Sequence, residues 1–188
     1  DREDIPKVVQ EFINENPDEP YVIFGFTSLV WIKLVLELKK KNIKLCSNNG
    51  IMLHGGGWKK LTDQAVTRKK FNDTVSLQLG ISAIHNYYGM VEQTGSVFLE
   101  CEEGFFHSSI FSDVLIRNKN LEIANLNEEG LIQVLSLLPQ SYPGHNILTE
   151  DIGMLIGIDN CKCGRKGKYF NVNGRVQGAE LRGCSDVY

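Results

Sequence analysis

Apolar and polar residues alternate with two different periods in the first half of the chain. Helical spacing predicts a helix over 5–14, and a short apolar run predicts a buried strand over 21–26. From Thr27, a candidate N-cap, helical spacing resumes until the basic run at 39–41. The same patterns predict strands over 43–46, 51–54 and 81–85, and a charged helix over 61–79. This order is typical of an α/β fold with a partly parallel sheet flanked by helices.

The second half of the chain has a different pattern. Short apolar runs separated by turn residues predict strands over 112–117, 130–135 and 153–158. Such runs favour a smaller, mostly antiparallel sheet. We therefore divide the chain into an α/β part, residues 1–97, and a smaller β-rich part, residues 98–188.

Composition and charge describe an ordinary globular chain. Of the 188 residues, 42% are apolar and 23% are charged, which argues against disorder. The 20 basic and 23 acidic residues give a net charge of −3, which disfavours nucleic-acid binding as the main activity. The most apolar stretch, 21–38, is interrupted by Gly25 and Lys33, so no membrane span is predicted.

The cysteines and the start of the chain bear on its setting. Five cysteines, an odd number, do not suggest a secreted disulfide scaffold, and we expect a cytoplasmic protein. The chain starts at Asp1 without an initiator Met or a signal peptide, which predicts an internal piece of a longer protein.

A glycine cluster follows the strand predicted over 51–54. In the string His-Gly-Gly-Gly-Trp-Lys, residues Gly55, Gly56 and Gly57 would let a ligand approach the backbone N–H groups closely. A tight turn without a ligand is the alternative interpretation.

A second candidate follows the strand predicted over 81–85, where ligands of open α/β sheets bind. Tyr88 offers an aromatic face, Gly89 allows close approach, and Glu92 offers a carboxylate that would act near phosphates through Mg²⁺. The alternative is a core aromatic patch followed by an exposed glutamate.

Two further motifs lie in the second half. The string Thr-Glu-Asp-Ile-Gly at 149–153 predicts an acidic turn, in which a carboxylate accepts hydrogen bonds from two ribose hydroxyls; a simple turn is the alternative. The segment 174–184 is punctuated by glycines and carries Arg175, Arg182 and Cys184. Arg182 would favour the thiolate form of Cys184, whereas an incidental cysteine is the alternative.

The order of these motifs resembles the second half of the large domain of adenylate-forming enzymes. The strings Gly-Gly-Gly-Trp-Lys-Lys, Tyr-Gly-Met-x-Glu-Gln and Ala-Glu-Leu-Arg-Gly-Cys are most similar to the acyl-protein synthetase family. That family includes the fatty-acid activating component of the bacterial bioluminescence reductase, and phenylacetate–coenzyme A ligase-like proteins are related to it. The resemblance runs from about His54 to Cys184.

The resemblance implies that ATP and a carboxylic acid, in this family a fatty acid, give an acyl-adenylate and pyrophosphate. Residues 1–97 would then be the nucleotide-binding part, with Gly55 to Gly57 lining the adenine and acyl pocket and Tyr88 stacking on adenine. Glu92 would hold Mg²⁺ against the phosphates. Asp151 would bind the ribose hydroxyls, and Arg175 would contact ribose or phosphate.

The resemblance also implies an acyl acceptor within the chain. In acyl-protein synthetases a cysteine near the C-terminus receives the acyl group as a thioester, and Cys184 is the matching position. A thiol is a strong nucleophile towards an adenylate, and its thioester can pass the acyl group to a partner such as a reductase protein.

Two departures from the family pattern bear on turnover of ATP. The family usually has Thr before the Mg²⁺-binding glutamate, whereas this chain has Val91. Nothing in residues 1–53 resembles the Ser/Thr/Gly-rich phosphate loop that lies upstream in the superfamily. Either the chain is a piece that lacks this half, or the protein has lost the step.

A zinc site is a separate hypothesis. Cys101 and His107, with the Cys-x-Cys-Gly turn at Cys161 and Cys163, supply four N and S ligands, the number that a structural Zn²⁺ site needs. Some phenylacetate–coenzyme A ligase-like proteins have a similar set. The alternative is that Cys101 and His107 are unrelated to the later pair.

Three functions therefore remain in competition. The first is acyl transfer to Cys184, and the second is an acyl–coenzyme A ligase in which free coenzyme A replaces the internal thiol. The third is a non-catalytic, zinc-stabilised module, which Val91 and the missing phosphate loop favour.

Overall fold

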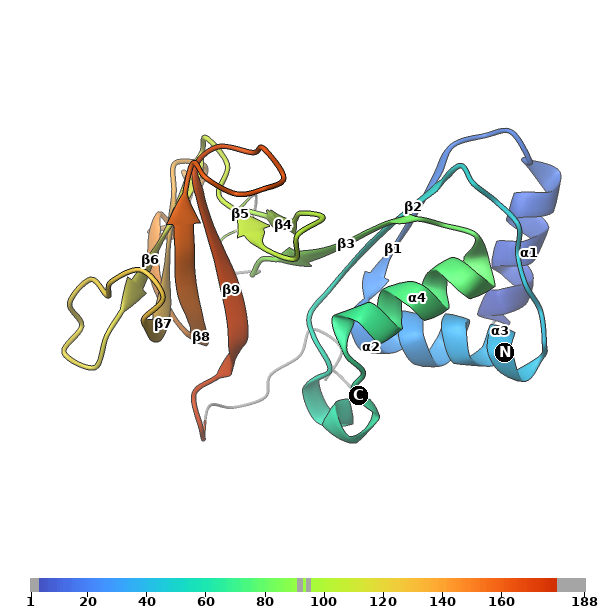
Figure 1. Cartoon of the computed structure of the whole chain (residues 1–188), viewed down its shortest axis with the longest axis horizontal. Coiled ribbons are helices and arrows are strands. Elements are labelled where there is room, and N and C mark those ends of the chain that lie inside the picture. Colours follow the sequence, from blue (N-terminus) through green and yellow to red (C-terminus); the bar gives the residue numbers. More distant parts are fainter. Residues whose placement is uncertain (1–3, 91–92, 94–95, 179–188) are drawn as a thin grey trace. The chain divides into compact units, whose positions relative to one another are not determined.

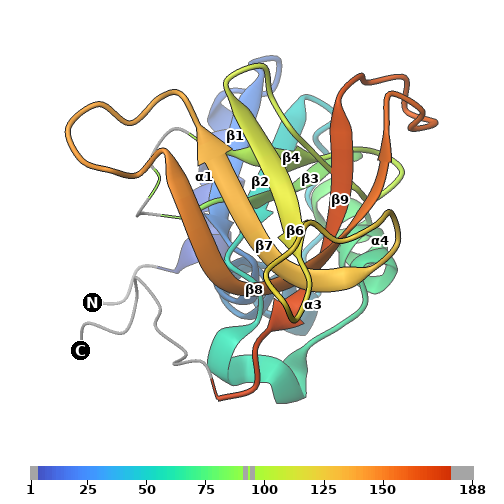
Figure 2. The same cartoon turned by 90° about the vertical axis from the view of Figure 1, so that its left-hand side faces the viewer.

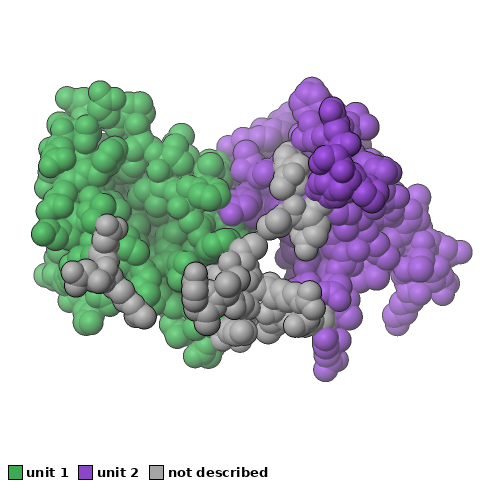
Figure 3. Space-filling view, turned by 180° about the vertical axis from the view of Figure 1, so that it is seen from behind, with its two compact units in different colours: residues 1–86, 183–188 green, residues 87–182 purple. Residues whose placement is uncertain are grey.

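The computed structural model describes residues 4–90, 93 and 96–178 of the chain (Figure 1). These residues divide into two compact units, of which unit 1 runs up to Asn86 and unit 2 begins at Tyr87 (Figure 3). The division of the chain at residue 97, which the sequence predicts, stays a prediction. None of the helices in the described part of the chain is long and apolar enough to cross a membrane.

Unit 1 alternates helices with strands, as the apolar pattern predicts. The helix expected over 5–14 is confirmed; Asp4 caps it by accepting a hydrogen bond from the Lys7 N–H at 3.3 Å. The strand expected over 21–26 is confirmed at the same residues. The elements of unit 1 are α1 (Ile5–Glu15), β1 (Tyr21–Phe26), α2 (Thr27–Leu29), the π-helical η1 (Val30–Val35), α3 (Leu36–Lys40), β2 (Gly50–Gly55), the 3₁₀-helical η2 (Lys59–Gln64), α4 (Arg68–Leu79) and β3 (Ala83–Tyr88).

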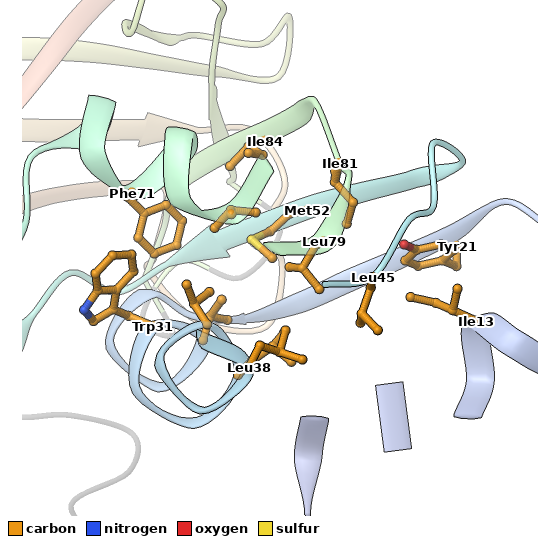
Figure 4. Packing of buried hydrophobic residues seen from close by; sticks show 14 residues of the cluster. Ile13, Tyr21, Trp31, Leu38, Leu45, Met52, Phe71, Leu79, Ile81 and Ile84 are labelled. Atoms are coloured by element: carbon orange, nitrogen blue, oxygen red, sulfur yellow. The ribbon is translucent and has the colours of Figure 1, made fainter. Parts of the chain in front are cut away.

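Strands β1 and β2 form a parallel pair in which Gly25 lies opposite His54 and Phe26 opposite Gly55. The order of hydrogen-bonded neighbours in unit 1 is β1-β2-β3. Helical residues such as Trp31 and Phe71 pack with Met52 of β2 in one buried cluster (Figure 4). Because side chains alternate along a strand, the other face of the pair is left exposed. It carries Val22, Phe24 and Ile51, which are 58%, 68% and 43% exposed.

Three sequence-based expectations in unit 1 are wrong. Residues 43–46 are not a strand, because Leu45 bonds through its N–H to the carbonyl of Gln78 at 2.7 Å rather than to a strand. Thr27 is not the helix cap, because its hydroxyl donates instead to the carbonyl oxygen of Gly55. The helix expected over 61–79 is broken: α4 begins only after its N-cap Thr67.

Unit 2 is an antiparallel sheet, as expected (Figure 2). From the end of β3, the neighbour order is β4-β5-β9-β8-β7-β6. Its core includes Phe98, Phe106 and Phe170 from three different strands. The strands are β4 (Phe98–Glu100), β5 (Phe106–His107), β6 (Ser112–Arg117), β7 (Glu129–Ser136), β8 (Asn146–Ile158) and β9 (Lys168–Arg175).

The long hairpin of β8 and β9 differs from the sequence-based expectation. The acidic turn predicted at 149–153 is wrong, since these residues lie inside β8. Arg175, expected on a loose glycine-rich segment, ends β9 and lies opposite Asp151. The strand β9 itself was not predicted, because in its string Lys-Tyr-Phe-Asn-Val-Asn-Gly-Arg the alternation of apolar and polar residues covers only Phe170 to Asn173.

Candidate functional site

A polar cluster in unit 2 joins the end of β3 to the β8–β9 hairpin. The Tyr88 hydroxyl donates a hydrogen bond to Oδ2 of Asp151 at 2.7 Å. Nε of Arg175 lies 3.3 Å from Oδ1 of the same carboxylate. Asp151 is therefore held from two sides, by a neutral donor and by a guanidinium. Three of the residues predicted from separate motifs are brought together here.

The backbone around Asp151 is fixed by neighbouring side chains. Its N–H bonds to Oγ1 of Thr149 at 3.1 Å, and the Thr149 hydroxyl donates to the carbonyl of Ile132 at 2.8 Å. Arg175 reaches Oε2 of the adjacent, more exposed Glu150 at 2.7 Å through a second nitrogen. The Asp151 side chain keeps 22% of its surface exposed, so its carboxylate can still accept hydrogen bonds from a ligand that carries hydroxyls.

The ring of Tyr88 lies among aromatic residues of unit 2. Its centroid is 6.0 Å from that of Phe98, 6.2 Å from that of Phe106 and 6.1 Å from that of Phe170. Burial and the negative charge of Asp151 raise the pKa of Tyr88 well above its usual value. The phenol therefore stays protonated and remains a donor to Asp151 through the physiological pH range.

The glycine segment belongs to unit 1 and follows β2 directly. Gly56 and Gly57 have φ angles of 76° and 62°, which favour glycine strongly. A Cβ atom added to Gly57 would meet no heavy atom within 4 Å, so the space beside this backbone is open. Such a segment can present its backbone to a ligand, as the sequence predicts.

Two expected site residues, Glu92 and Cys184, lie outside the described residues. Gly89 is described, and a Cβ atom added there would lie 3.2 Å from the carbonyl oxygen of Ser96.

The sequence motifs did not predict a further polar pair in unit 1, Thr27 and His54. Their bond joins residues 27 positions apart, and only the parallel register of β1 and β2 could have indicated it.

A second cluster in unit 2 brings together two cysteine-containing turns and one strand. The ligand atoms of Cys101, His107, Cys161 and Cys163 all lie within 4.8 Å of one another. The Cys101 and Cys161 sulfurs are 3.9 Å apart, and the Cys163 sulfur is 3.4 Å from Nε2 of His107. The two pairs of the sequence-based hypothesis are thus neighbours in space.

Local backbone geometry explains how these ligand atoms converge. In each turn a glycine N–H bonds to the carbonyl of the first cysteine: Gly104 to Cys101 at 2.9 Å and Gly164 to Cys161 at 3.0 Å. Both glycines have positive φ angles, 87° and 83°, which reverse the chain tightly. His107 is held in β5. The set of one imidazole and three thiols suits Zn²⁺.

Burial determines the protonation of Cys161 and His107 in this cluster. Desolvation raises the pKa of the Cys161 thiol to about 11, and desolvation lowers the pKa of His107. A neutral imidazole is the form that binds a metal, so His107 needs no proton loss at neutral pH. Its Nδ1 atom is buried and has no hydrogen-bond partner among the described residues.

The comparison with known families gives a decisive match. A family profile described as "Acyl-protein synthetase, LuxE" matches residues 4–188. The chain belongs to the acyl-protein synthetase family, LuxE. This family membership applies to nearly the whole chain and confirms the resemblance drawn from its motifs. Among curated proteins, none matches the chain.

Solved structures show the same fold in this acyl-protein synthetase chain and in adenylate-forming enzymes. A 2-hydroxyisobutyryl-CoA ligase in complex with 2-HIB-AMP and CoA has a TM-score of 0.67 at 15% identity, over 92% of this chain and 39% of that one. A long-chain-fatty-acid-CoA ligase, FadD1 from Archaeoglobus fulgidus, has a TM-score of 0.61 at 13% identity, with coverages of 91% and 37%. MbtA from Mycobacterium smegmatis has a TM-score of 0.60 at 14% identity, with coverages of 93% and 32%. The chain thus spans about a third of the length of these structures.

Proposed function

We propose that the full-length protein activates a carboxylic acid with ATP as an acyl-adenylate and transfers the acyl group to the thiol of Cys184. The observation that carries this proposal is the Tyr88–Asp151–Arg175 cluster, found in a chain of the acyl-protein synthetase family. Fold similarity to ligases of carboxylic acids supports the reaction class. A fatty acid is the substrate that we propose, as the family resemblance implies.

The polar cluster of unit 2 would bind the nucleoside part of ATP. Tyr88 contributes the aromatic surface for adenine, and Asp151 accepts hydrogen bonds from the ribose hydroxyls. Arg175, already beside that carboxylate, balances its charge and contacts ribose or phosphate. In unit 1, the Gly55–Gly57 segment would present its backbone to a ligand, and the positive φ angles of Gly56 and Gly57 favour glycine there. In unit 2, Gly89 would allow close approach of the ligand, as the motif predicts. Glu92, which lies outside the described residues, would hold Mg²⁺, and this ion would supply positive charge beside the phosphates.

The proposed reaction has two steps, activation of the acid and transfer of the acyl group. A carboxylate oxygen of the acid attacks the α-phosphorus of ATP, and the bond to the β-phosphate oxygen breaks to release pyrophosphate. The sulfur of Cys184 then attacks the acyl carbonyl, the bond from that carbonyl to the AMP oxygen breaks, and the thiol proton passes to solvent. A thioester remains, from which an acceptor such as a reductase protein takes the acyl group. A cytoplasmic, reducing location keeps the acceptor thiol available.

Intact mass spectrometry tests this proposal on the full-length protein. Incubation with Mg²⁺, ATP and a panel of fatty acids of different length should add the mass of one acyl group. Hydroxylamine should remove it, and Cys184→Ser should abolish it. Pyrophosphate release without an adduct, accompanied by acyl–coenzyme A when coenzyme A is added, would favour the ligase alternative. Absence of both signals would contradict acid activation and leave the non-catalytic module.

We infer that the second cluster holds a structural Zn²⁺ ion. Tetrahedral Zn²⁺ with bonds of about 2.3 Å to sulfur separates two thiolates by about 3.8 Å. The Cys101 and Cys161 sulfurs already lie 3.9 Å apart without rearrangement of the backbone. Four protein ligands leave no open position for substrate, so the ion would stabilise unit 2 rather than take part in catalysis.

Metal analysis of the purified full-length protein tests the zinc site. One zinc per chain is expected in the wild type, and Cys161→Ser should reduce it strongly. Cys46→Ser is the matched control, because Cys46 is exposed and lies outside the cluster. Equal zinc in the wild type and in Cys161→Ser would contradict the site.

A further inference from the structure

The glycine segment begins where a parallel pair of strands ends. Phe26, the last residue of β1, lies opposite Gly55, the last residue of β2. Thr27 therefore follows β1 at the same edge at which Gly56 follows β2. Ligands of open α/β sheets bind beyond these carboxyl ends of strands. Any side chain that fixes the backbone at this edge also determines the shape of the surface that a ligand meets.

Thr27 and His54 form a buried hydrogen-bond network at this edge. The Thr27 hydroxyl donates to the carbonyl oxygen of Gly55 at 3.0 Å, and its oxygen lies 2.9 Å from Nδ1 of His54. Thr27 and His54 are only 5% and 6% exposed. A hydroxyl has one proton, so both contacts are hydrogen bonds only when Nδ1 carries a hydrogen and donates it to Thr27. The network thereby selects one tautomer of His54 and one orientation of the Gly55 carbonyl.

Aromatic contacts hold both flanks of the glycine segment. The ring centroid of His54, just before the segment, lies 4.4 Å from that of Phe71. Trp58, just after it, has its ring 6.1 Å from that of Trp31, which in turn is 5.6 Å from Phe71. Three consecutive glycines lose much conformational freedom on ordering. The anchored flanks reduce the number of conformations that the segment can adopt.

We propose that Thr27 and His54 are positioning residues, which hold the Gly55 carbonyl and, through it, the Gly55–Gly57 segment in the conformation that receives the substrate. This inference rests on the proposed function, in which the segment lines the adenine and acyl pocket. Neither residue needs to touch the substrate. Their effect is to have the backbone of the segment ordered before binding, which lowers the entropic cost of binding.

Burial, together with nearby positive charges, keeps the His54 imidazole neutral. Burial lowers its pKa to about 4, and the charges of Arg68 in α4 and of His85 in β3 act in the same direction. At neutral pH the Nδ1 hydrogen thus goes to Thr27 while Nε2 carries a lone pair. The network should therefore be insensitive to pH from neutrality down to about pH 5.

Paired substitutions in the full-length protein separate positioning from folding. Thr27→Val removes the hydroxyl at nearly constant volume, whereas Thr27→Ser retains it. Ser28→Ala is the matched control, because Ser28 is also buried but is not part of the network. In ATP–pyrophosphate exchange, Thr27→Val should raise KM for ATP about tenfold or more, because the Gly55 carbonyl and the His54 N–H lose their partner. Thr27→Ser and Ser28→Ala should stay within about threefold of the wild type, and kcat should change less than KM.

Hydrogen–deuterium exchange of the peptide that contains residues 54–59 measures the conformation without using activity. Thr27→Val should accelerate exchange in this peptide about tenfold or more, and Thr27→Ser should restore the protection. Unchanged exchange in Thr27→Val would overturn the positioning role, whatever the activity. Accelerated exchange in a protein whose wild type activates no acid would support the positioning role and instead refute the proposed function.

Discussion

The phenolic hydroxyl of Tyr88 donates a hydrogen bond of 2.7 Å to Oδ2 of Asp151, which joins two motifs 63 positions apart in the sequence. Each motif by itself was compatible with an ordinary core patch or turn. Their contact, together with the ion pair between Asp151 and Arg175, gives one polar site within unit 2.

Tyr88→Phe should weaken ATP binding without unfolding the protein. The substitution keeps the ring and its contacts with three phenylalanines, but removes the donor to the Asp151 carboxylate. Hydrogen bonds to charged groups contribute about 1.5–3 kcal/mol, so KM for ATP should rise about tenfold or more in pyrophosphate exchange. Tyr21→Phe is the control, because the buried Tyr21 hydroxyl has no hydrogen-bond partner among the described residues. An unchanged KM in Tyr88→Phe would contradict a role for the hydroxyl in the site.

Asp151→Asn should reduce kcat/KM for ATP about tenfold to a hundredfold, because a charged acceptor becomes a neutral amide. The fold should be kept, with a Tm change of about 3 °C or less, since Arg175 retains its contact with Glu150. Glu150→Gln provides the comparison: it removes the neighbouring, mostly exposed carboxylate and should change kcat/KM less than about threefold. If the two variants behaved alike, the special role of Asp151 would be wrong.

Cys161→Ser should lower the stability of unit 2, whereas Cys46→Ser should not. The zinc site that we infer joins the turn after β8 to β5 and to the turn that carries Cys101. Removal of one ligand should lower Tm by several degrees, and a chelator should lower the Tm of the wild type towards that of the variant. Thermal scans with and without chelator, monitored by near-UV circular dichroism, measure both effects. A chelator that left the wild-type Tm unchanged would count against a stabilising ion.

His54 should make stability fall on acidification. Its pKa is about 4 in the folded protein, against 6.5 in the unfolded chain, so the unfolded chain binds more protons between these values. Its contribution is complete above about pH 6.5 and is lost as the pH falls towards 4, about 3 kcal/mol of the free energy of unfolding in total. Denaturant unfolding at several pH values measures this loss. In His54→Asn, which has no titrating group there, the corresponding part of the pH dependence should disappear.

Elements with a clear period were predictable, whereas those that depend on a partner were not. β1 and β6 were predicted at the same residues because their apolar runs are bounded by turn or polar residues. Residues 43–46 are also a short, mostly apolar stretch, but they form a connecting segment. The buried Leu45 bonds through its N–H to the carbonyl of Gln78 near the end of α4. No local pattern distinguishes these two cases, because only the hydrogen-bond partner differs.

The residues of the candidate sites were predictable where they belong to a recognisable motif, but their contacts were not. The sequence grouped Cys101, His107, Cys161 and Cys163 as a candidate metal site because their spacings are typical of zinc ligands, and the structure brings their ligand atoms together. The family resemblance implied Tyr88, Asp151 and Arg175 as nucleotide-binding residues, but it did not predict the hydrogen bond and the ion pair that join them. The pair Thr27 and His54 was missed, since threonine and histidine are common and their contact depends on the register of β1 and β2.

The β8–β9 hairpin carries parts of both sites along its length. Asp151 and Arg175 face each other near one end, and Cys161 and Cys163 lie in the connection at the other. A single inserted or deleted residue between these ends would turn the following side chains to the opposite face of the sheet. The bulges between Ile152 and Gly153 and between Leu155 and Gly157 are part of the required spacing. Insertions and deletions in this family should therefore occur in connections outside the hairpin, such as 118–128, and the number of residues in the hairpin should stay constant.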